Sequence, residues 1–277
     1  MKRSGNVSNK GILHAEAGRR RFALERFDPS PDLAFFVEHY WMVRWDLRGQ
    51  APYRQEILSY PSVNLVFERE GPHYYTGVYG VPPATYIRHL HGEGAVLGIK
   101  FRPGGFYPFC KQPLSRLTGL NVPCGELLGV DVRLTERRMF ELESAEQMAE
   151  LAESFLRERK PQRDAQAELA GQMTETVSRD RSICKVEELA GRFGLSVRAL
   201  QRMFERYVGV SPKWVIRRFR LQEAAQQMES GHVPDWAHLA FELGYYDQAH
   251  FIKDFKSLIG KTPQEYLKEL QIRKSSE

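Results

Sequence analysis

The C-terminal half of the chain contains an internal repeat, and this repeat limits the fold more than any other feature. The segment "VEELAGRFGLSVRALQRMFERYVGVSP" (186–212) aligns with "WAHLAFELGYYDQAHFIKDFKSLIGKTP" (236–263). Leu189, Ala190 and Gly194 recur 50 residues later as Leu239, Ala240 and Gly244. After one additional residue in the second copy, Leu200, Phe204, Gly209 and Pro212 recur 51 residues later as Phe251, Phe255, Gly260 and Pro263. Because the two segments match at so many equivalent positions, we expect both to form the same structural unit.

Each copy has the pattern of a helix-turn-helix. A short helix is followed by a turn opened by Gly194 or Gly244, and a second helix starts at an N-cap, Ser196 or Asp247. Each second helix carries an apolar stripe at spacing i, i+4, i+7 and i+8, which predicts a buried face. The stripes consist of Leu200, Phe204, Tyr207 and Val208 and of Phe251, Phe255, Leu258 and Ile259.

A single helix is predicted between the two copies. It runs from Pro212 to Ser230, after Ser211 and before Gly231. At 1.5 Å per residue its length is about 28 Å. One turn of B-DNA measures roughly 34 Å, so this helix can hold two DNA-reading units about one groove apart.

The exposed sides of the two second helices carry residue types that contact DNA. A recognition helix enters the major groove with its N-terminal end first, so its first turns need long hydrogen-bonding side chains. Arg198 and Arg202 can bond guanine, and Gln201 can bond adenine. Arg206 lies one turn further on, where we expect a phosphate contact. The predicted DNA-binding residues are Ser196, Val197, Arg198, Gln201, Arg202 and Arg206 in the first copy and Gln248, Ala249, His250 and Lys253 in the second. Solvated positions on an amphipathic helix would explain one such face better than two in register.

The stretch "GYYDQAHFIKDF" (244–255) is rich in titratable groups and could be taken for an active site. A helix, however, spreads such groups around its axis. We therefore expect Tyr245 in the core, Asp247 as a cap, His250 partly exposed and Lys253 at the DNA. No catalytic residue is predicted, and the chain is not expected to be an enzyme.

Basic charge is concentrated in the same region. Residues 185–220 contain nine basic and three acidic residues, a net +6, whereas the whole chain has a net charge of +5. Such a local excess suits a polyanion. The three cysteines fit neither a disulfide framework nor a metal-ligand spacing, which favours a reducing cytoplasm. No signal peptide and no apolar run of membrane-spanning length is found, so no membrane partner is expected.

The N-terminal half predicts a β-rich domain. Segments with alternating apolar residues, such as "VEHYWMVRW" and "SVNLVFE", are separated by Gly and Pro, and further strands are expected at 73–79, 85–91 and 95–101. An apolar helical stripe follows at 145–156, either for dimerisation or for packing on the chain's own sheet. The charged stretch "RERKPQRDAQ" predicts a linker. The predicted class is α+β: a β-barrel or cupin-like domain with helices at 1–162, and an all-α domain at 163–277.

The C-terminal hundred residues resemble the paired helix-turn-helix domain of the AraC/XylS family of transcription regulators. The segment "LAFELGYYDQAHFIKDFKSLIGKTPQEY" carries this resemblance. It implies a transcription regulator whose monomer grips two successive major grooves of double-stranded DNA, with RNA polymerase as a further partner.

In that family the other domain usually senses a small molecule or dimerises. The segments "YPSVNLVFE" and "GIKFRPGGFYPF" resemble uncharacterised domains that precede AraC-type modules. A binding site lined by aromatic side chains and one cationic side chain would favour a small acidic or aromatic effector. The candidate effector-binding residues are Trp41, Trp45, Tyr60, Tyr74 and Arg102, and the competing interpretation is ordinary β core with a structural arginine.

A cupin-type metalloenzyme domain fused to a DNA-binding module is the alternative function. His89 and His91 alternate onto one strand face, with His39, His73 and Glu93 as further candidate ligands. Because a lone His-x-His pair is more often surface or core, no metal and no other cofactor is predicted.

Overall fold

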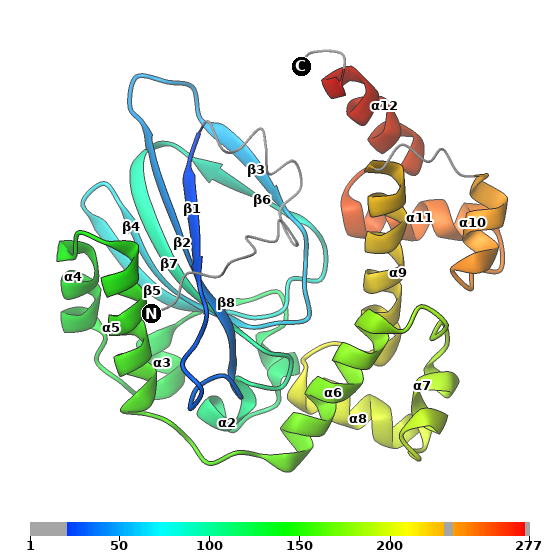
Figure 1. Ribbon diagram of the computed structural model, residues 1–277, viewed down its shortest axis with the longest axis horizontal. Helices are drawn as coiled ribbons and strands as arrows, with labels where there is room; N and C mark the ends of the chain where they lie inside the picture. The colour runs from blue at the N-terminus through cyan, green and yellow to red at the C-terminus, as the bar shows by residue number, and fades with distance from the viewer. Residues whose placement is uncertain (1–20, 230–234, 275–277) are drawn as a thin grey trace.

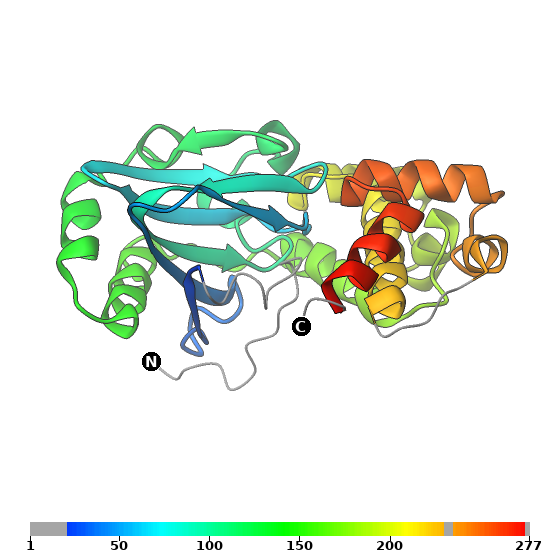
Figure 2. The ribbon, with the colours of Figure 1, turned by 90° about the horizontal axis from the view of Figure 1, so that it is seen from above.

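The computed structural model describes residues 21–229 and 235–274. It has the predicted α+β class, with a β-rich N-terminal part beside a helical C-terminal part (Figures 1 and 2). No helix in the described residues is both long and apolar enough to cross a membrane.

The N-terminal part is built on an antiparallel sheet of six strands in the order β1-β2-β7-β4-β5-β8. The strands are β1 (Ala23–Phe27), β2 (Val37–Leu47), β7 (Gly92–Phe101), β4 (Asn64–Glu70), β5 (His73–Tyr79) and β8 (Asn121–Pro123). A separate pair consists of β3 (Tyr53–Ile57) and β6 (Tyr86–Leu90). Within the described ranges, the outer strands β1 and β8 each pair on one side only, with β2 and β5, so the cupin-like arrangement is open and not a closed barrel.

The two faces of the large sheet have different coverings. One face packs under α4 (Arg133–Glu141) and α5 (Ala145–Arg157), with Phe155 edge-on to Phe67 at 5.6 Å (Figure 1). The other face carries Trp45, which packs in one apolar cluster with Leu90 of the β3–β6 pair. Because the stripe of α5 is buried in its own domain, the predicted dimerisation through that stripe is wrong. Packing on the chain's own sheet is what occurs.

Short elements connect the sheet to the helices. These are α2 (Tyr107–Cys110), a 3-10 helix η1 (Leu114–Leu117) and α3 (Cys124–Leu128). The helical part then begins with α6 (Ala165–Arg179). Ala167 of α6 joins the sheet core, whereas Met173 and Val177 join the helical core, so α6 packs against both parts.

The predicted helix-turn-helix pair is confirmed. The first copy consists of α7 (Val186–Arg192) and α8 (Val197–Tyr207), and the second of α10 (Trp236–Glu242) and α11 (Gln248–Ile259). The intervening helix α9 spans Pro212–Glu229, and α12 spans Pro263–Lys274. The predicted end of α9 at Ser230 lies outside the described residues. Gly194 and Gly244 have φ of 64° and 76°, a left-handed conformation that explains why glycine opens both turns.

Candidate nucleic-acid interface

The first candidate recognition helix is α8. The Ser196 hydroxyl accepts a hydrogen bond from the Ala199 amide at 3.2 Å, as the predicted N-cap requires. Leu200 and Phe204 are fully buried on the inner side. The predicted DNA-facing side chains Arg198, Gln201 and Arg202 are all exposed, whereas Val197 is half-buried against the helical core. The first two turns of α8 therefore present two guanidinium groups and one amide to solvent.

The second candidate recognition helix is α11. Asp247 accepts a hydrogen bond from the His250 amide at 2.7 Å, and Phe251 and Phe255 are buried. Gln248, Ala249, His250 and Lys253 are exposed, as predicted.

The titratable groups of "GYYDQAHFIKDF" do not converge. Tyr245 is buried with its ring edge toward Phe251, and Asp247 is the cap. His250 lies 3.2 Å from a guanidinium nitrogen of Arg217, which also pairs with Asp254 at 3.0 Å. The predicted positions of Tyr245, Asp247 and His250 agree with this structure, whereas Lys253 is exposed and its contact with DNA stays a prediction.

Helix α9 fixes the two units relative to each other. Its N-terminal half supplies Val215 and Ile216 to the core of the first unit, and its C-terminal half supplies Leu221 and Met228 to the core of the second. Eighteen residues of helix span about 27 Å. One continuous helix thus holds both recognition helices.

The two recognition helices point the same way. In Figure 1, α8 and α11 both extend away from the sheet, toward α7 and α10. The N-terminal domain contacts them near their C-terminal ends: Arg206 of α8 bonds Tyr107, and the Leu258 carbonyl of α11 accepts from the Thr85 amide at 3.1 Å. The N-terminal turns of both helices are left exposed on the far side.

Arg206 has a partner within the protein that the sequence did not predict. Its Nε and Nη2 donate to the Tyr107 hydroxyl at 2.8 and 2.5 Å, so its guanidinium bonds the N-terminal domain while the residue as a whole remains exposed. Sequence reasoning missed this contact because nothing in the pattern of α8 reports what its last turn packs against.

Two further arginines of the basic segment are buried. Arg218 is 0% exposed, and its Nε donates to the Ser59 carbonyl of the N-terminal domain. Arg220 is buried too, and donates to the carbonyls of Val177 and Asp180. By contrast, Arg198, Arg202 and Lys253 make no hydrogen bond or ion pair with the described part of the chain. Fewer positive charges are therefore exposed for DNA than the net charge of residues 185–220 indicates.

The five candidate effector-binding residues do not surround one cavity. The rings of Trp41 and Trp45 lie against Gly98 and Gly94 of β7, where an added Cβ would come within 2.0 and 2.2 Å of them. Tyr74 lies on the opposite face of the sheet, near Phe140 at 5.9 Å. Tyr60 packs edge-on to Phe219 at the domain interface, and Arg102 donates to the Ala34 carbonyl. Packing against the glycines of β7 accounts for both tryptophans, as the competing interpretation of ordinary β core expects.

The candidate metal ligands are also dispersed. His39 is largely buried beside Lys100 and Glu38, His91 pairs with Glu70 at 3.0 Å, and His73 and His89 are exposed. In residues 21–229 and 235–274, no group of three or more His, Cys, Asp or Glu side chains has metal-binding geometry.

Comparison with known proteins gives two family matches. Residues 189–269 match a helix-turn-helix domain, and residues 25–123 match a domain of unknown function, DUF6597. An HTH-type transcriptional activator, RhaS, from Escherichia fergusonii is 35% identical over 80 residues, 28% of each chain. An uncharacterised HTH-type transcriptional regulator from Haemophilus influenzae is 32% identical over 87 residues, 31% of this chain and 29% of the relative. The similarity thus spans less than a third of these relatives.

Solved structures show weaker similarity. A probable AraC family transcriptional regulator from Rhodopseudomonas palustris is 28% identical, with 36% of this chain and 94% of that chain covered and a TM-score of 0.32. ToxT from Vibrio cholerae is 15% identical, with 91% and 98% covered and a TM-score of 0.38. The sequence matches support the resemblance to AraC/XylS regulators: residues 189–269 match a helix-turn-helix domain like that of HTH-type transcriptional regulators, and residues 25–123 match a DUF6597 domain.

Proposed function

We propose that this protein is a sequence-specific, DNA-binding transcription regulator that acts in the cytoplasm and responds to a small molecule bound by its N-terminal domain. One observation carries the proposal: two capped recognition helices project their N-terminal turns in the same direction from one connecting helix. A monomer with this geometry can place both helices in successive major grooves. RNA polymerase would then be its partner at the promoter.

The two recognition helices are proposed to divide the work. Arg198, Gln201 and Arg202 of α8 can all make directional contacts with base edges. In α11, Ala249 and Ile252 separate Gln248 from Lys253, so fewer groups can discriminate between bases. We expect α8 to supply most of the sequence preference and α11 mainly to hold the DNA backbone, with Gln248 able to bond an adenine.

Site selection from random duplex DNA with the purified full-length protein tests both proposals. The wild type is expected to enrich one motif, with an affinity that falls steeply with salt because phosphate contacts release counterions. Arg202→Ala should relax the preference at one or two base pairs, at a cost of about 1–3 kcal/mol. Lys253→Ala should weaken binding to all duplexes alike and reduce the salt slope by about one.

Arg133→Ala serves as the matched control, because Arg133 is an exposed arginine on α4 that pairs with Asp131. This variant should select the wild-type motif. Folded wild-type protein that enriches no motif would rule out the proposed function. A changed motif with Lys253→Ala and an intact one with Arg202→Ala would instead reverse the assignment of the two helices.

A further inference from the structure

Two arginines face each other across the helix-covered side of the large sheet. Arg44 of β2 and Arg69 of β4 are both paired in register with Ala95 of the central strand β7. Side chains directly opposite in neighbouring strands lie on the same face. The small Ala95 therefore leaves a hollow between two guanidinium-bearing side chains.

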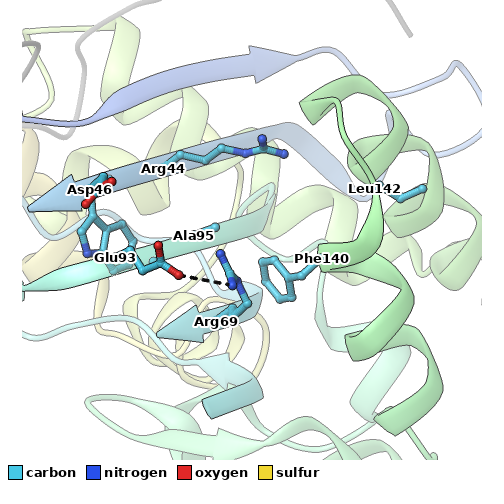
Figure 3. A pocket seen from close by; sticks show the side chains of 9 residues that line it. Arg44, Asp46, Arg69, Glu93, Ala95, Phe140 and Leu142 are labelled. Carbon is cyan, nitrogen blue, oxygen red and sulfur yellow. Dashed lines mark ion pairs between the residues drawn. The ribbon is translucent and has the colours of Figure 1, made fainter. Parts of the chain in front are cut away.

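A pocket of about 180 Å³ lies at this hollow. Its lining residues are drawn in Figure 3, with Phe140 and Leu142 on the helical side. Phe140 belongs to α4, and Leu142 directly follows that helix. Both side chains are half-buried, and Phe140 packs near Tyr74, which is paired in register with Arg69. The pocket thus has an apolar side opposite its two cationic groups.

The acidic residues at the pocket are already neutralised from outside. Glu93 pairs with Arg48 at 3.1 Å, and Asp46 pairs with the same arginine at 2.6 Å. Arg69 forms an ion pair with Glu93 at 3.8 Å, the dashed line in Figure 3, and this distance is too long for a hydrogen bond. Arg48 therefore compensates both carboxylates at short range, and Arg69 adds only a longer ion pair to Glu93.

The arginines themselves have only weak partners. Arg44 donates to the Glu143 carbonyl and to the Met148 sulfur, both at 3.2 Å, and neither acceptor is charged. The Nε of Arg69 is buried without a hydrogen-bond partner in the described residues. A buried donor left unsatisfied is costly, and guanidinium groups bond carboxylates best, often through two parallel hydrogen bonds.

We propose that this pocket binds a small organic monocarboxylate, with its carboxylate between Arg44 and Arg69 and its ring or short chain against Phe140 and Leu142. The volume suits a compact ligand, because pockets for drug-sized molecules measure roughly 300–1,000 Å³. The site lies on the helix-covered face of the sheet and not between the two sheets. That this ligand regulates transcription rests on the proposed function, whereas binding itself does not.

Calorimetric titration of the full-length protein with benzoate, without DNA, tests the site. Benzoate should bind, while benzamide, its neutral analogue, and benzylamine, its cationic analogue, should not. Loss of one charge-assisted interaction should weaken benzoate binding about tenfold or more in Arg69→Gln and in Arg44→Gln. Arg133→Gln, which changes an exposed arginine outside the pocket, should bind as the wild type does.

Circular dichroism of each variant establishes that it is folded, and the exposed Arg44 provides a test if Arg69→Gln does not fold. Three outcomes would overturn the proposal: no benzoate binding by folded wild type at millimolar concentration, equal binding by wild type and a folded Arg44→Gln variant, or equal binding of benzoate and benzamide. DNA is absent from this titration, so a lack of benzoate binding would not affect the result of the site selection. Likewise, a failed site selection would not affect the result of the titration.

Discussion

His39 is a histidine kept neutral by its surroundings. Its side chain is 16% exposed, and burial lowers its pKa from 6.5 to about 3, with the charges of Lys100 and Arg26 acting in the same direction. Glu38 lies 3.8 Å from Nδ1 and would favour the charged ring, but that carboxylate already bonds Lys100 at 3.2 Å. Burial and the two cations therefore dominate.

The pKa of His39 predicts an acid-sensitive fold. Between pH 6.5 and 3 the unfolded chain binds a proton that the folded chain does not, so stability is present above pH 6.5 and is lost as the pH falls. The free energy of unfolding should decrease by about 3 kcal/mol from this residue between pH 6.5 and pH 4. His39→Gln should remove that part of the decrease, measured by urea unfolding at several pH values.

His91→Gln is the matched control, because His91 is 62% exposed on the same domain. It should keep the wild-type pH profile. If His39→Gln loses stability toward pH 4 as steeply as His91→Gln does, the proposed neutral state of His39 is wrong.

At the scale of the elements, both recognition helices depend on a side-chain cap. Ser196 and Asp247 each accept a backbone amide of the first turn, and Asp247 adds a negative charge at the positive end of the helix dipole. These caps also set where the exposed turns begin. A lost cap would therefore affect the part of the helix that is proposed to enter the groove.

Asp247→Ala should lower the free energy of unfolding by about 1 kcal/mol, whereas Asp247→Asn should retain most of the cap because asparagine is an equally good N-cap. Urea denaturation followed by circular dichroism measures the difference. Lys256→Ala, at an exposed position in the last turn of α11, should change stability by less than about 0.5 kcal/mol. Equal stability of Asp247→Ala and the wild type would refute the role of the cap.

At the scale of the whole molecule, the N-terminal domain contacts both helix-turn-helix units. Besides the contacts of Arg206 and Thr85, Lys261 pairs with Glu56 at 3.0 Å, and the Trp214 indole donates to the Pro83 carbonyl at 3.0 Å. Arg218 adds a buried cation, and burial lowers its pKa to about 10. Burying a charge without an acidic partner costs free energy. The other contacts across the interface must therefore offset the cost of burying Arg218.

Release of Arg206 from Tyr107 should change DNA binding. Tyr107→Phe removes the hydroxyl that accepts from Arg206, and the freed guanidinium, on the same side of α8 as Arg198 and Arg202, can then contact phosphate. The salt slope of DNA binding should steepen by about one in Tyr107→Phe. Adding Arg206→Ala to that variant should return the slope to the wild-type value. An unchanged slope in Tyr107→Phe would show that Arg206 does not reach the DNA.

Local sequence patterns are enough to predict most helices and several strands of this protein. The two helix-turn-helix units, their glycine turns and their caps follow from interactions within about ten residues, so periodicity and capping rules predict them. The strands at 73–79 and 95–101 were predictable for the same reason, because alternation reports a half-buried strand directly. Domain bounds at 1–162 and 163–277 remain a proposal, since α6 packs against both parts.

The surroundings of the individual side chains, in contrast, depend on long-range packing. Arg198, Arg206 and Arg218 are equivalent bases in the sequence, yet one is exposed, one bonds Tyr107 and one is buried against Ser59. The pocket between Arg44 and Arg69 likewise depends on the register of three strands that are distant in the chain. Strand register and domain docking arise from contacts between segments that are distant in the sequence. The pattern within one segment therefore does not predict which segment it packs against.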